Sequence, residues 1–356
     1  MSRPRISYYA HHMGTGHLRH ARRLIETGVF EVQVASTGEE NQGLLPVGAN
    51  YVPLRPDIDD QRPESPVPVS GEFLHYAPTG DHIVERFAAL NRAWEQFAPD
   101  VVMVDVSVEV ALFARLSGYR VALRRMPGQR NDKAHLMGYE IADALFAYFP
   151  EALEEREHLA KFGSKSHYFK TPEPASGFDK TQHIGASLAD PVPGERKVAM
   201  QTSLAASIGL SDIAHAAASS PQWSWDVLGS VHEDTECMPE NLTLHGTVQQ
   251  PSRIMAQADV VLTSTGHNAV ATAAACGRPM LLIPEERPFD EQRVYARMLQ
   301  RATGCMTLDS WKEPVNWNAV LEQAAASDPH ALSRVLFTDA DEFTRQVEAM
   351  VRELTS

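Results

Sequence analysis

Short, uninterrupted apolar runs alternate with amphipathic segments along both halves of this 356-residue chain. The run VVMVDV at 101–106 is typical of a strand buried on both faces, and the segment 83–97 before it repeats apolar residues every three or four positions, as a helix does. The alternation restarts with KVAMQTS at 197–203 and continues to PMLLIP at 279–284. Two such series predict an α/β chain with two Rossmann-like, doubly wound parallel-sheet domains that face a cleft.

Segments rich in proline and glycine divide this pattern. The stretch from 171 to 194, which contains TPEPASGF and DPVPGE, predicts an interdomain linker at 173–194 and therefore domains at 1–172 and 195–338. A second proline-rich segment, 54–78, is long enough to be a lid or an acceptor-binding loop. An apolar stripe predicts a last helix within 339–356, and Ser211 is a plausible N-cap of a helix in the second series.

Composition excludes several classes of protein. The net charge of −14 opposes a nucleic-acid groove, which needs a basic field. The three cysteines are widely separated, so they predict neither a zinc cluster nor a disulfide framework and suit a reducing compartment. No run of about 18 apolar residues and no N-terminal signal core is present, so we expect a cytoplasmic protein without a transmembrane helix.

The stretch ISYYAHHMGTGHLRHARRL at 6–24 places four histidines and two glycines where an apolar strand meets a helix. As a dinucleotide loop it is incomplete, because Arg19 stands at the position of the third glycine. As a metal site it offers His17 and His20 on one helix face but no carboxylate or cysteine at ligand spacing. The third interpretation is that His17, kept neutral by the positive helix end, is a general base; the alternative is that it only caps the helix.

A second loop, within 258–292, has the features of an anion site. A buried strand leads into Thr265, Gly266, His267 and Asn268, which open an alanine-rich helix. Free N–H groups and the helix dipole at such a junction can hold a diphosphate. The polar pair at 290 and 292, just after the next strand, suits the hydroxyl groups of a sugar.

The order of features from 246 to 292 resembles the nucleotide-sugar half of GT-B glycosyltransferases, most like the MurG-type family with its family 28-type C-terminal domain. The GTGH motif at 14–17 is similar to that family's N-terminal glycine-rich loop. The resemblance implies inverting, metal-independent transfer of a hexosyl or N-acetylhexosaminyl group from a nucleoside diphosphate sugar, usually UDP-linked, to a hydroxyl acceptor. It also implies an acceptor-side domain at 1–172, a nucleotide-sugar-binding domain at 195–338 and a last helix, 339–356, that packs back on the first domain.

The resemblance assigns site residues. His17 is the expected catalytic base. The residues expected to bind the nucleotide sugar are Gly14, Gly16, Thr202, Ser203, Gly246, Val248, Thr265, Gly266, His267, Asn268, Thr272, Asp290 and Gln292. His12 and Asp105 are possible acceptor contacts, although Asp105 could instead be a helix N-cap. Two departures stand out: Thr272 replaces the glutamate that many relatives use for ribose, and QTSLAAS at 201–207 replaces a glycine-rich turn.

Three further expectations concern ligands and rival activities. Asp57-x-Asp59 and Asp339-x-Asp341 match a short metal-binding acidic motif, but neither is predicted to follow a strand, so we interpret both as solvated charges, and no metal or cofactor is expected. The expected partners are a nucleotide sugar and an unknown hydroxyl acceptor, with membrane contact only if that acceptor is lipid-linked. The alternatives are a MurG-related sugar-nucleotide hydrolase or 2-epimerase, and a non-catalytic nucleotide-sugar-binding protein.

Overall fold

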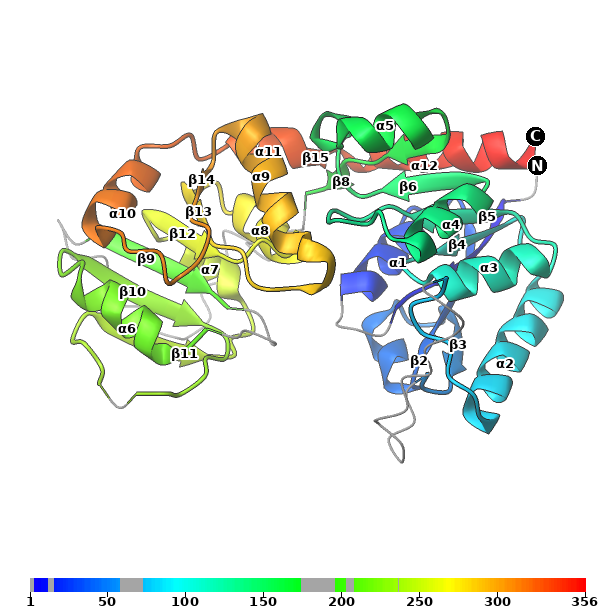
Figure 1. The fold of residues 1–356 in the computed structure, drawn as a ribbon, viewed down its shortest axis with the longest axis horizontal. Helices are drawn as coiled ribbons and strands as arrows, with labels where there is room; N and C mark the ends of the chain where they lie inside the picture. Colours follow the sequence, from blue (N-terminus) through cyan, green and yellow to red (C-terminus); the bar gives the residue numbers. More distant parts are fainter. Residues whose placement is uncertain (1–2, 12–15, 58–72, 174–195, 203–207, 236) are drawn as a thin grey trace. The chain divides into compact units, whose positions relative to one another are not determined.

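The computed structural model describes residues 3–11, 16–57, 73–173, 196–202, 208–235 and 237–356 (Figure 1). The chain divides into two compact units. Unit 1 comprises Met1–Met126, Arg130–Lys170 and Asp339–Ser356, and unit 2 comprises Pro127–Gln129 and Thr171–Thr338. All but the first residue of the predicted linker 173–194, and most of the proline-rich segment 54–78, lie outside the described residues.

Unit 1 is a doubly wound α/β unit. Its elements are β1 (Arg5–Tyr9), α1 (Gly16–Glu26), β2 (Glu31–Thr37), η1 (Glu40–Leu44), β3 (Asn50–Leu54), α2 (Asp81–Phe97), β4 (Val101–Val104), α3 (Val108–Leu116), β5 (Val121–Arg124), α4 (Lys133–Ile141), β6 (Ala144–Ala147), η2 (Glu151–Leu153), α5 (Arg156–Phe162), η3 (Gly163–Lys165), β7 (Ser166–Tyr168) and α12 (Ala340–Thr355). Its seven strands are all parallel, in the order β3-β2-β1-β4-β5-β6-β7.

Alternate residues of each central strand of unit 1 face two different cores. Val101 and Met103 of β4 pack with side chains of α1 and α12, whereas Val102 and Val104 pack with α2 and α3. This explains the continuous apolar run, because a parallel strand with helices on both sides has no polar face. The amphipathic helix α12 buries Phe343, Val347, Met350 and Val351 in the first of these cores, so the end of the chain is part of unit 1.

Unit 2 repeats the architecture. Its elements are β8 (Thr171–Pro172), β9 (Arg196–Gln201), α6 (Leu210–Ala218), β10 (Trp223–Leu228), β11 (Leu242–Gly246), α7 (Pro251–Met255), β12 (Val260–Thr263), α8 (His267–Ala274), β13 (Met280–Leu282), η4 (Pro288–Asp290), α9 (Glu291–Thr303), β14 (Met306–Thr307), α10 (Trp317–Ala325), α11 (Ala331–Leu336) and β15 (Phe337–Thr338). Six parallel strands follow the order β11-β10-β9-β12-β13-β14, and β15 pairs with β8 separately.

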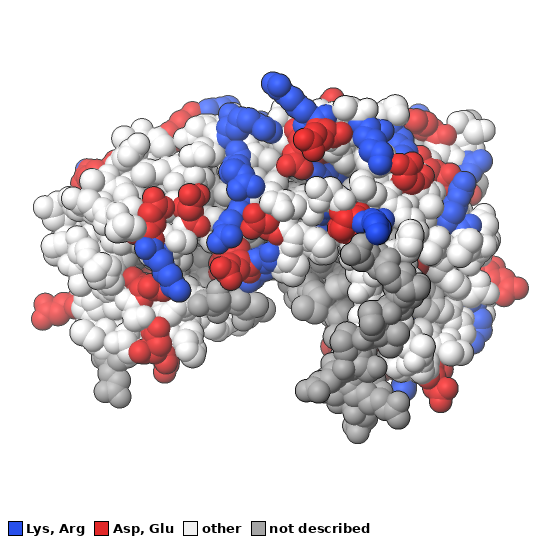
Figure 2. Space-filling view, in the orientation of Figure 1, with Lys and Arg blue, Asp and Glu red and all other residues white. Residues whose placement is uncertain are grey.

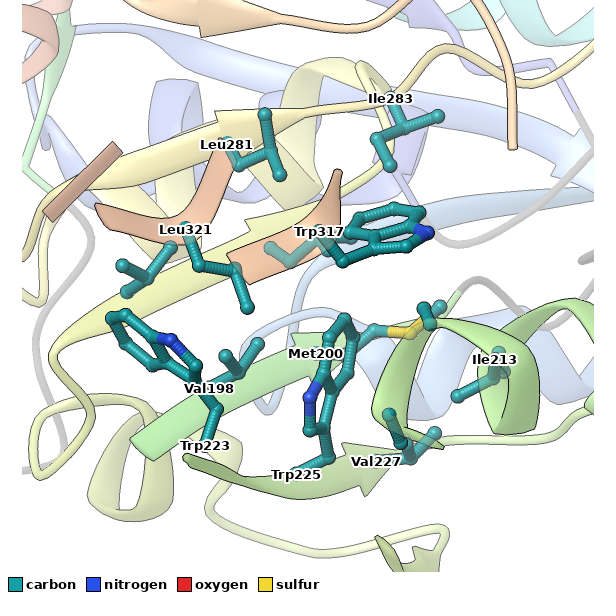
Figure 3. Close-up of a cluster of buried hydrophobic side chains, with 14 of the residues drawn as sticks. Val198, Met200, Ile213, Trp223, Trp225, Val227, Leu281, Ile283, Trp317 and Leu321 are labelled. Carbon is teal, nitrogen blue, oxygen red and sulfur yellow. The ribbon is translucent and has the colours of Figure 1, made fainter. Parts of the chain in front are cut away.

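One face of the unit 2 sheet carries a core rich in tryptophan (Figure 3). Trp223 and Trp225 of β10 are buried there, and Trp317 at the start of α10 meets Trp225 edge-on with ring centroids 5.8 Å apart. The buried Trp225 indole N–H donates to Ser220 Oγ at 3.0 Å, so its burial leaves no donor unpaired. Two doubly wound parallel sheets confirm the predicted fold class.

Three local predictions are wrong. No strand is predicted before Asp57, yet β3 ends three residues earlier; Pro53 is tolerated inside it because β3 is the edge strand of its sheet. Ser211 is not an N-cap, because α6 is preceded by Gly209 as its N-cap. The Asp234 carboxylate instead accepts from the Ser211 N–H and hydroxyl, both at 2.7 Å, and so satisfies the first turn from outside the helix. Asp339 directly follows the two-residue strand β15, so the prediction that no strand precedes it is wrong as well, and it caps α12 by accepting from the Glu342 N–H.

Charged side chains are intermingled on the surface. On the face in Figure 2, basic and acidic residues alternate over the described parts of both units rather than forming one broad field of a single sign. Among the described residues, no helix has both the length and the apolar character needed to cross a bilayer.

Candidate active site

The carboxyl edge of the unit 1 sheet gathers several polar side chains at one point. β1 and β4 are neighbours in the sheet. After β1 the chain continues to β2 on one flank of this pair, and after β4 it continues to β5 on the other flank. Ligands of open α/β sheets bind at such a switch point. Gly16 and His17 open α1 directly after β1, whereas His12 and Gly14 lie outside the described residues.

His17 and Asp105 form a hydrogen-bonded pair at this point. His17 Nδ1 lies 2.9 Å from Asp105 Oδ2; the histidine side chain is 15% exposed and the aspartate is fully buried. Burial alone would raise the pKa of Asp105, but the charge of Arg124 and the contact with His17 hold it well below its usual range. Asp105 is therefore a carboxylate that only accepts, so His17 Nδ1 carries a proton and donates it. A neutral His17 then has its lone pair on Nε2, the atom a general base needs.

The structure rejects the N-cap interpretation of Asp105. Ser107 is the N-cap of α3, because its hydroxyl accepts from the Val110 N–H at 3.2 Å. Between the two lies Val106, whose φ of +87° is unusual for a β-branched residue. Strained backbone of this kind costs free energy and is concentrated at functional sites. The strained residue thus lies directly after the buried carboxylate.

Three further residues of this site were missed from the sequence. Arg124 Nη1 donates to Asp105 Oδ1 at 2.8 Å, and the Tyr8 hydroxyl donates to Asp105 Oδ2 at 2.9 Å. The Arg124 guanidinium carbon lies over the Tyr148 ring, 4.9 Å from the ring centroid. The Tyr148 hydroxyl is 3.3 Å from the Tyr8 hydroxyl. Burial and the Asp105 charge raise the pKa of Tyr8 well above its usual value, so its hydroxyl keeps the proton that it donates.

Strand periodicity explains how these groups converge. Tyr8, Asp105 and Arg124 each lie two residues beyond an apolar residue of the core that α1 covers, namely Ile6, Met103 and Ala122. Alternate residues of a strand face the same side of a sheet, so all three point toward α1. The sequence held one signal for Arg124, namely the pair of arginines at 124 and 125 that follows the apolar run 121–123. Only the strand order shows that this run lies next to β4.

The switch point of unit 2 lies between β9 and β12, and the loop that begins α8 follows β12. Gly266 is the N-cap of α8, and an N-cap glycine leaves the first N–H groups of the helix without a capping side chain. A methyl group added at Gly266 would make only ordinary contacts, the nearest at 3.7 Å to Gln292 Nε2. Neither backbone strain nor protein crowding therefore requires glycine at this position, which is consistent with close approach of a ligand.

Gln292 connects the loop after β12 with the loop after β13. Its Oε1 accepts from the Thr265 N–H at 3.1 Å and from the Glu285 N–H at 2.9 Å, and its carbonyl oxygen accepts from the Thr265 hydroxyl at 2.7 Å. Gln292 is only 4% exposed. Thr265 and Gln292 thus hold the loop after β12 against the loop after β13, with the Thr265 hydroxyl turned to protein.

The loop after β13 is strained immediately before α9. Phe289 and Asp290 both have positive φ, 60° and 55°, and Asp290 is the N-cap of α9. Left-handed backbone is costly for a bulky residue such as phenylalanine. The Asp290 carboxylate accepts from Arg293 Nη1 at 3.4 Å and remains partly exposed.

The remaining predicted donor residues occupy mixed surroundings. The Thr202 hydroxyl lies within hydrogen-bond distance of the Leu228 and Ser230 carbonyl oxygens, so it connects strand ends. The Thr272 hydroxyl donates back to the Asn268 carbonyl oxygen at 2.8 Å, inside α8. His267 Nδ1 is 3.5 Å from the Tyr295 hydroxyl. Ser203 lies outside the described residues, whereas Gly246 ends β11 with positive φ and Val248 is half-buried in the loop after it.

One group of metal-ligand type occurs among the described residues, formed by His75, Asp132 and His135 in unit 1. The Asp132 carboxylate lies 2.9 Å from His75 Nε2 and 2.6 Å from His135 Nδ1. Arg130 Nη1 lies 2.9 Å from the other ring nitrogen of His135. A permanently charged arginine thus already provides a cation beside this group, which opposes a second cation there.

Comparison with known proteins finds one matching family model and several solved structures of similar fold. Residues 231–335 match the family model described as the glycosyltransferase family 28 C-terminal domain. CalG4, the calicheamicin glycosyltransferase, superposes with a TM-score of 0.68 over the full length of both chains at 15% identity. MurG of Acinetobacter baumannii gives 0.59 at 13% identity over 98% of this chain and 100% of its own. SsfS6 from Streptomyces sp. SF2575, solved with thymidine diphosphate, gives 0.59 at 15% identity over 97% and 99%. No curated protein matches the chain.

Proposed function

We propose that this chain, which has the GT-B fold and carries a glycosyltransferase family 28 C-terminal domain in unit 2, transfers a sugar from a nucleoside diphosphate sugar to a hydroxyl group of an acceptor. The observation that carries the proposal is the 2.9 Å pair between His17 Nδ1 and buried Asp105, because it leaves Nε2 available as a base. Unit 2 supports it with the glycine-capped start of α8 at the end of β12.

The proposed reaction is a single displacement. The acceptor oxygen forms a bond to the anomeric carbon of the donor while the bond from that carbon to the diphosphate oxygen breaks, which inverts the configuration. The acceptor hydroxyl proton passes to His17 Nε2, and Asp105 stabilises the imidazolium that results. The bonding electrons leave with the diphosphate, whose charge the N–H groups and the dipole at the start of α8 stabilise.

Turnover with a panel of nucleotide sugars tests the reaction class. We expect His17→Ala to lower kcat by about 10²- to 10⁴-fold, the usual contribution of a positioned base. His245→Ala is the matched control, because His245 also pairs with an aspartate, Asp226, at 2.6 Å but lies in unit 2 away from the switch point strands. A His17→Ala enzyme with full transfer activity would exclude the base assignment. Release of free sugar or a 2-epimer without acceptor would indicate the hydrolase or epimerase, and binding without product the non-catalytic protein.

Thermal shift against nucleotides tests the donor site separately. We expect UDP or thymidine diphosphate to raise Tm more than the matching monophosphates do, because ligand binding stabilises the folded state by mass action. Gly266→Ala should fold normally but lose this shift, since its methyl group would occupy the space of the ligand. Gly163→Ala is the control, because a methyl group there also meets only ordinary contacts, at 3.8 Å or more. An unchanged nucleotide response in Gly266→Ala would contradict this placement.

We also propose that the helix start, rather than a metal ion, offsets the charge of the leaving diphosphate. Turnover should then be unchanged after dialysis against EDTA. A loss of turnover that Mg²⁺ or Mn²⁺ restores would show that a metal ion takes this part instead.

A further inference from the structure

Arg124 is buried in the unit 1 site without a part in the proposed proton transfer. It ends β5, is 7% exposed, and donates to Asp105 Oδ1 at 2.8 Å. The same Nη1 atom is 3.4 Å from His17 Nδ1. Its Nε is buried and has no hydrogen-bond partner in the part of the chain that the structure describes. A buried ion pair with an unsatisfied donor is a poor way to stabilise a fold. Within the described residues Arg125 has the same unsatisfied Nε, so what sets Arg124 apart is its contact with His17.

The charges at this site balance only in one protonation state. The Arg124 guanidinium and the Asp105 carboxylate cancel, so a neutral His17 leaves the buried group of three without net charge. Protonation of His17 would leave one net positive charge in a desolvated site, with two cations 3.4 Å apart. Without Arg124, the whole charge of Asp105 would face the imidazole and favour an imidazolium, which cannot act as a base.

We propose that Arg124 is a positioning residue that holds Asp105 against His17 and keeps His17 in its neutral form with the proton on Nδ1. This inference rests on the proposed function of His17 as a base. Arg124 acts through Asp105 and does not itself receive the substrate proton. Its two effects are geometric, through the hydrogen bond to Oδ1, and electrostatic, through the charge near Nδ1.

Other groups around His17 differ from Arg124 in kind. Tyr8 donates to Asp105 from β1 without adding charge, and Tyr148, beyond β6, lies beneath the guanidinium. His11, which follows β1, has its ring centroid 5.7 Å from that of His17. On α1 itself, His20 stacks on Tyr148 at 3.8 Å, with Arg23 Nη1 3.2 Å from its Nδ1. Arg124 is thus the arginine in direct contact with both members of the pair.

The experiment compares Arg124→Met with Arg125→Met. Arg125 is the next residue, is buried to 3% exposure and pairs with Glu154 at 3.0 Å, but it points to the opposite face of the sheet. Removing it therefore reports the cost of losing a buried arginine without touching the His17 pair. Arg124→Lys retains the charge and loses the planar fork.

Two readouts separate this inference from the proposed function. The first is ¹⁵N NMR of the histidine rings, which reports the tautomer and titration of His17 in the absence of any substrate. The second is the pH dependence of kcat/KM with the donor that the nucleotide-sugar panel identifies. In Arg124→Met we expect the acidic limb and the NMR titration of His17 to lie at higher pH than in wild type, because removing a neighbouring cation favours protonation. Arg124→Lys retains the cation and should behave more like wild type in both readouts, while its kcat falls.

The outcomes are distinct. The inference is overturned if His17 in Arg124→Met has the same NMR titration and the same tautomer as His17 in wild type and in Arg125→Met. If the NMR titration of His17 moves in Arg124→Met but no variant and no wild-type enzyme turns over a nucleotide sugar, the inference about Arg124 stands and the proposed sugar transfer is rejected. If Arg124→Met does not fold, Arg124→Lys decides, because a purely structural arginine predicts lost Tm in that variant with no selective loss of kcat.

Discussion

At the scale of the residue, the protein depends on one buried carboxylate that serves three donors. Asp105 accepts from Arg124, Tyr8 and His17, and it directly precedes the strained Val106. Asp105→Asn keeps the shape of the side chain but removes its charge, so His17 no longer has a fixed tautomer. We expect kcat to fall by about 10²- to 10⁴-fold. We also expect a lower Tm, because Arg124 becomes an uncompensated buried charge.

Steady-state kinetics and thermal melting measure both effects, with Asp226→Asn as the control from the pair in unit 2. If Asp105→Asn lowers Tm and leaves kcat unchanged, Asp105 is structural only.

A second residue, His158, makes stability depend on pH. Burial, together with the charge of Arg125, lowers the pKa of His158 to about 3. The unfolded chain protonates this group near pH 6.5 and the folded chain only near 3, so its contribution to stability is complete above pH 6.5 and is lost as the pH falls toward 3. Urea denaturation between pH 7 and 4 should show a shallower decline for His158→Gln than for wild type. Equal slopes would contradict the assignment.

At the scale of the element, the side-chain amide of Gln292 holds the loop after β12 against the loop after β13. Gln292→Leu leaves the buried N–H groups of Thr265 and Glu285 without their acceptor, each at a cost of about 1–3 kcal/mol. We expect a total loss of about 2–6 kcal/mol and faster hydrogen exchange at both loops. Gln300→Leu, on the exposed side of the same helix, is the control and should change stability by less than about 0.5 kcal/mol. Unchanged exchange at residue 265 would show that the loop is held by other contacts.

Elements also show how far the sequence could lead. Periodicity predicted α2, α12 and the buried strand β4, because long regular patterns are determined locally. It missed β3, whose Pro53 is acceptable only at a sheet edge, and an edge is a property of the assembled sheet.

The candidate site, too, could be predicted from the sequence only in part. His17 was found because a histidine between glycine and a helix start is visible in the sequence. The part of Asp105 and the presence of Arg124 depend on β1, β4 and β5 being neighbours, although β4 begins 92 residues after β1 ends. Gln292 was expected to face a sugar, and its hydrogen bonds to two backbone N–H groups could not be read from its spacing.

At the scale of the whole molecule, the ends of the chain belong to the same unit. Removing 339–356 would expose the core that Phe343, Val347, Met350 and Val351 fill. At about 1.5–3 kcal/mol for each side chain, the loss of about 6–12 kcal/mol matches the entire stability of a typical domain. We expect chain 1–338 to lose the melting transition of unit 1, as followed by calorimetry, whereas chain 1–354 retains it. Survival of both transitions in chain 1–338 would contradict this view of α12.

The position of α12 also bears on how the protein is made. A ribosome releases the residues of α12 only after the whole of unit 2 has emerged. Unit 2, which is nearly continuous in the chain, can reach its native state during translation, whereas unit 1 must wait with part of its apolar interior open until α12 has emerged. The half that carries the proposed base is therefore the half that nascent-chain chaperones have to shield.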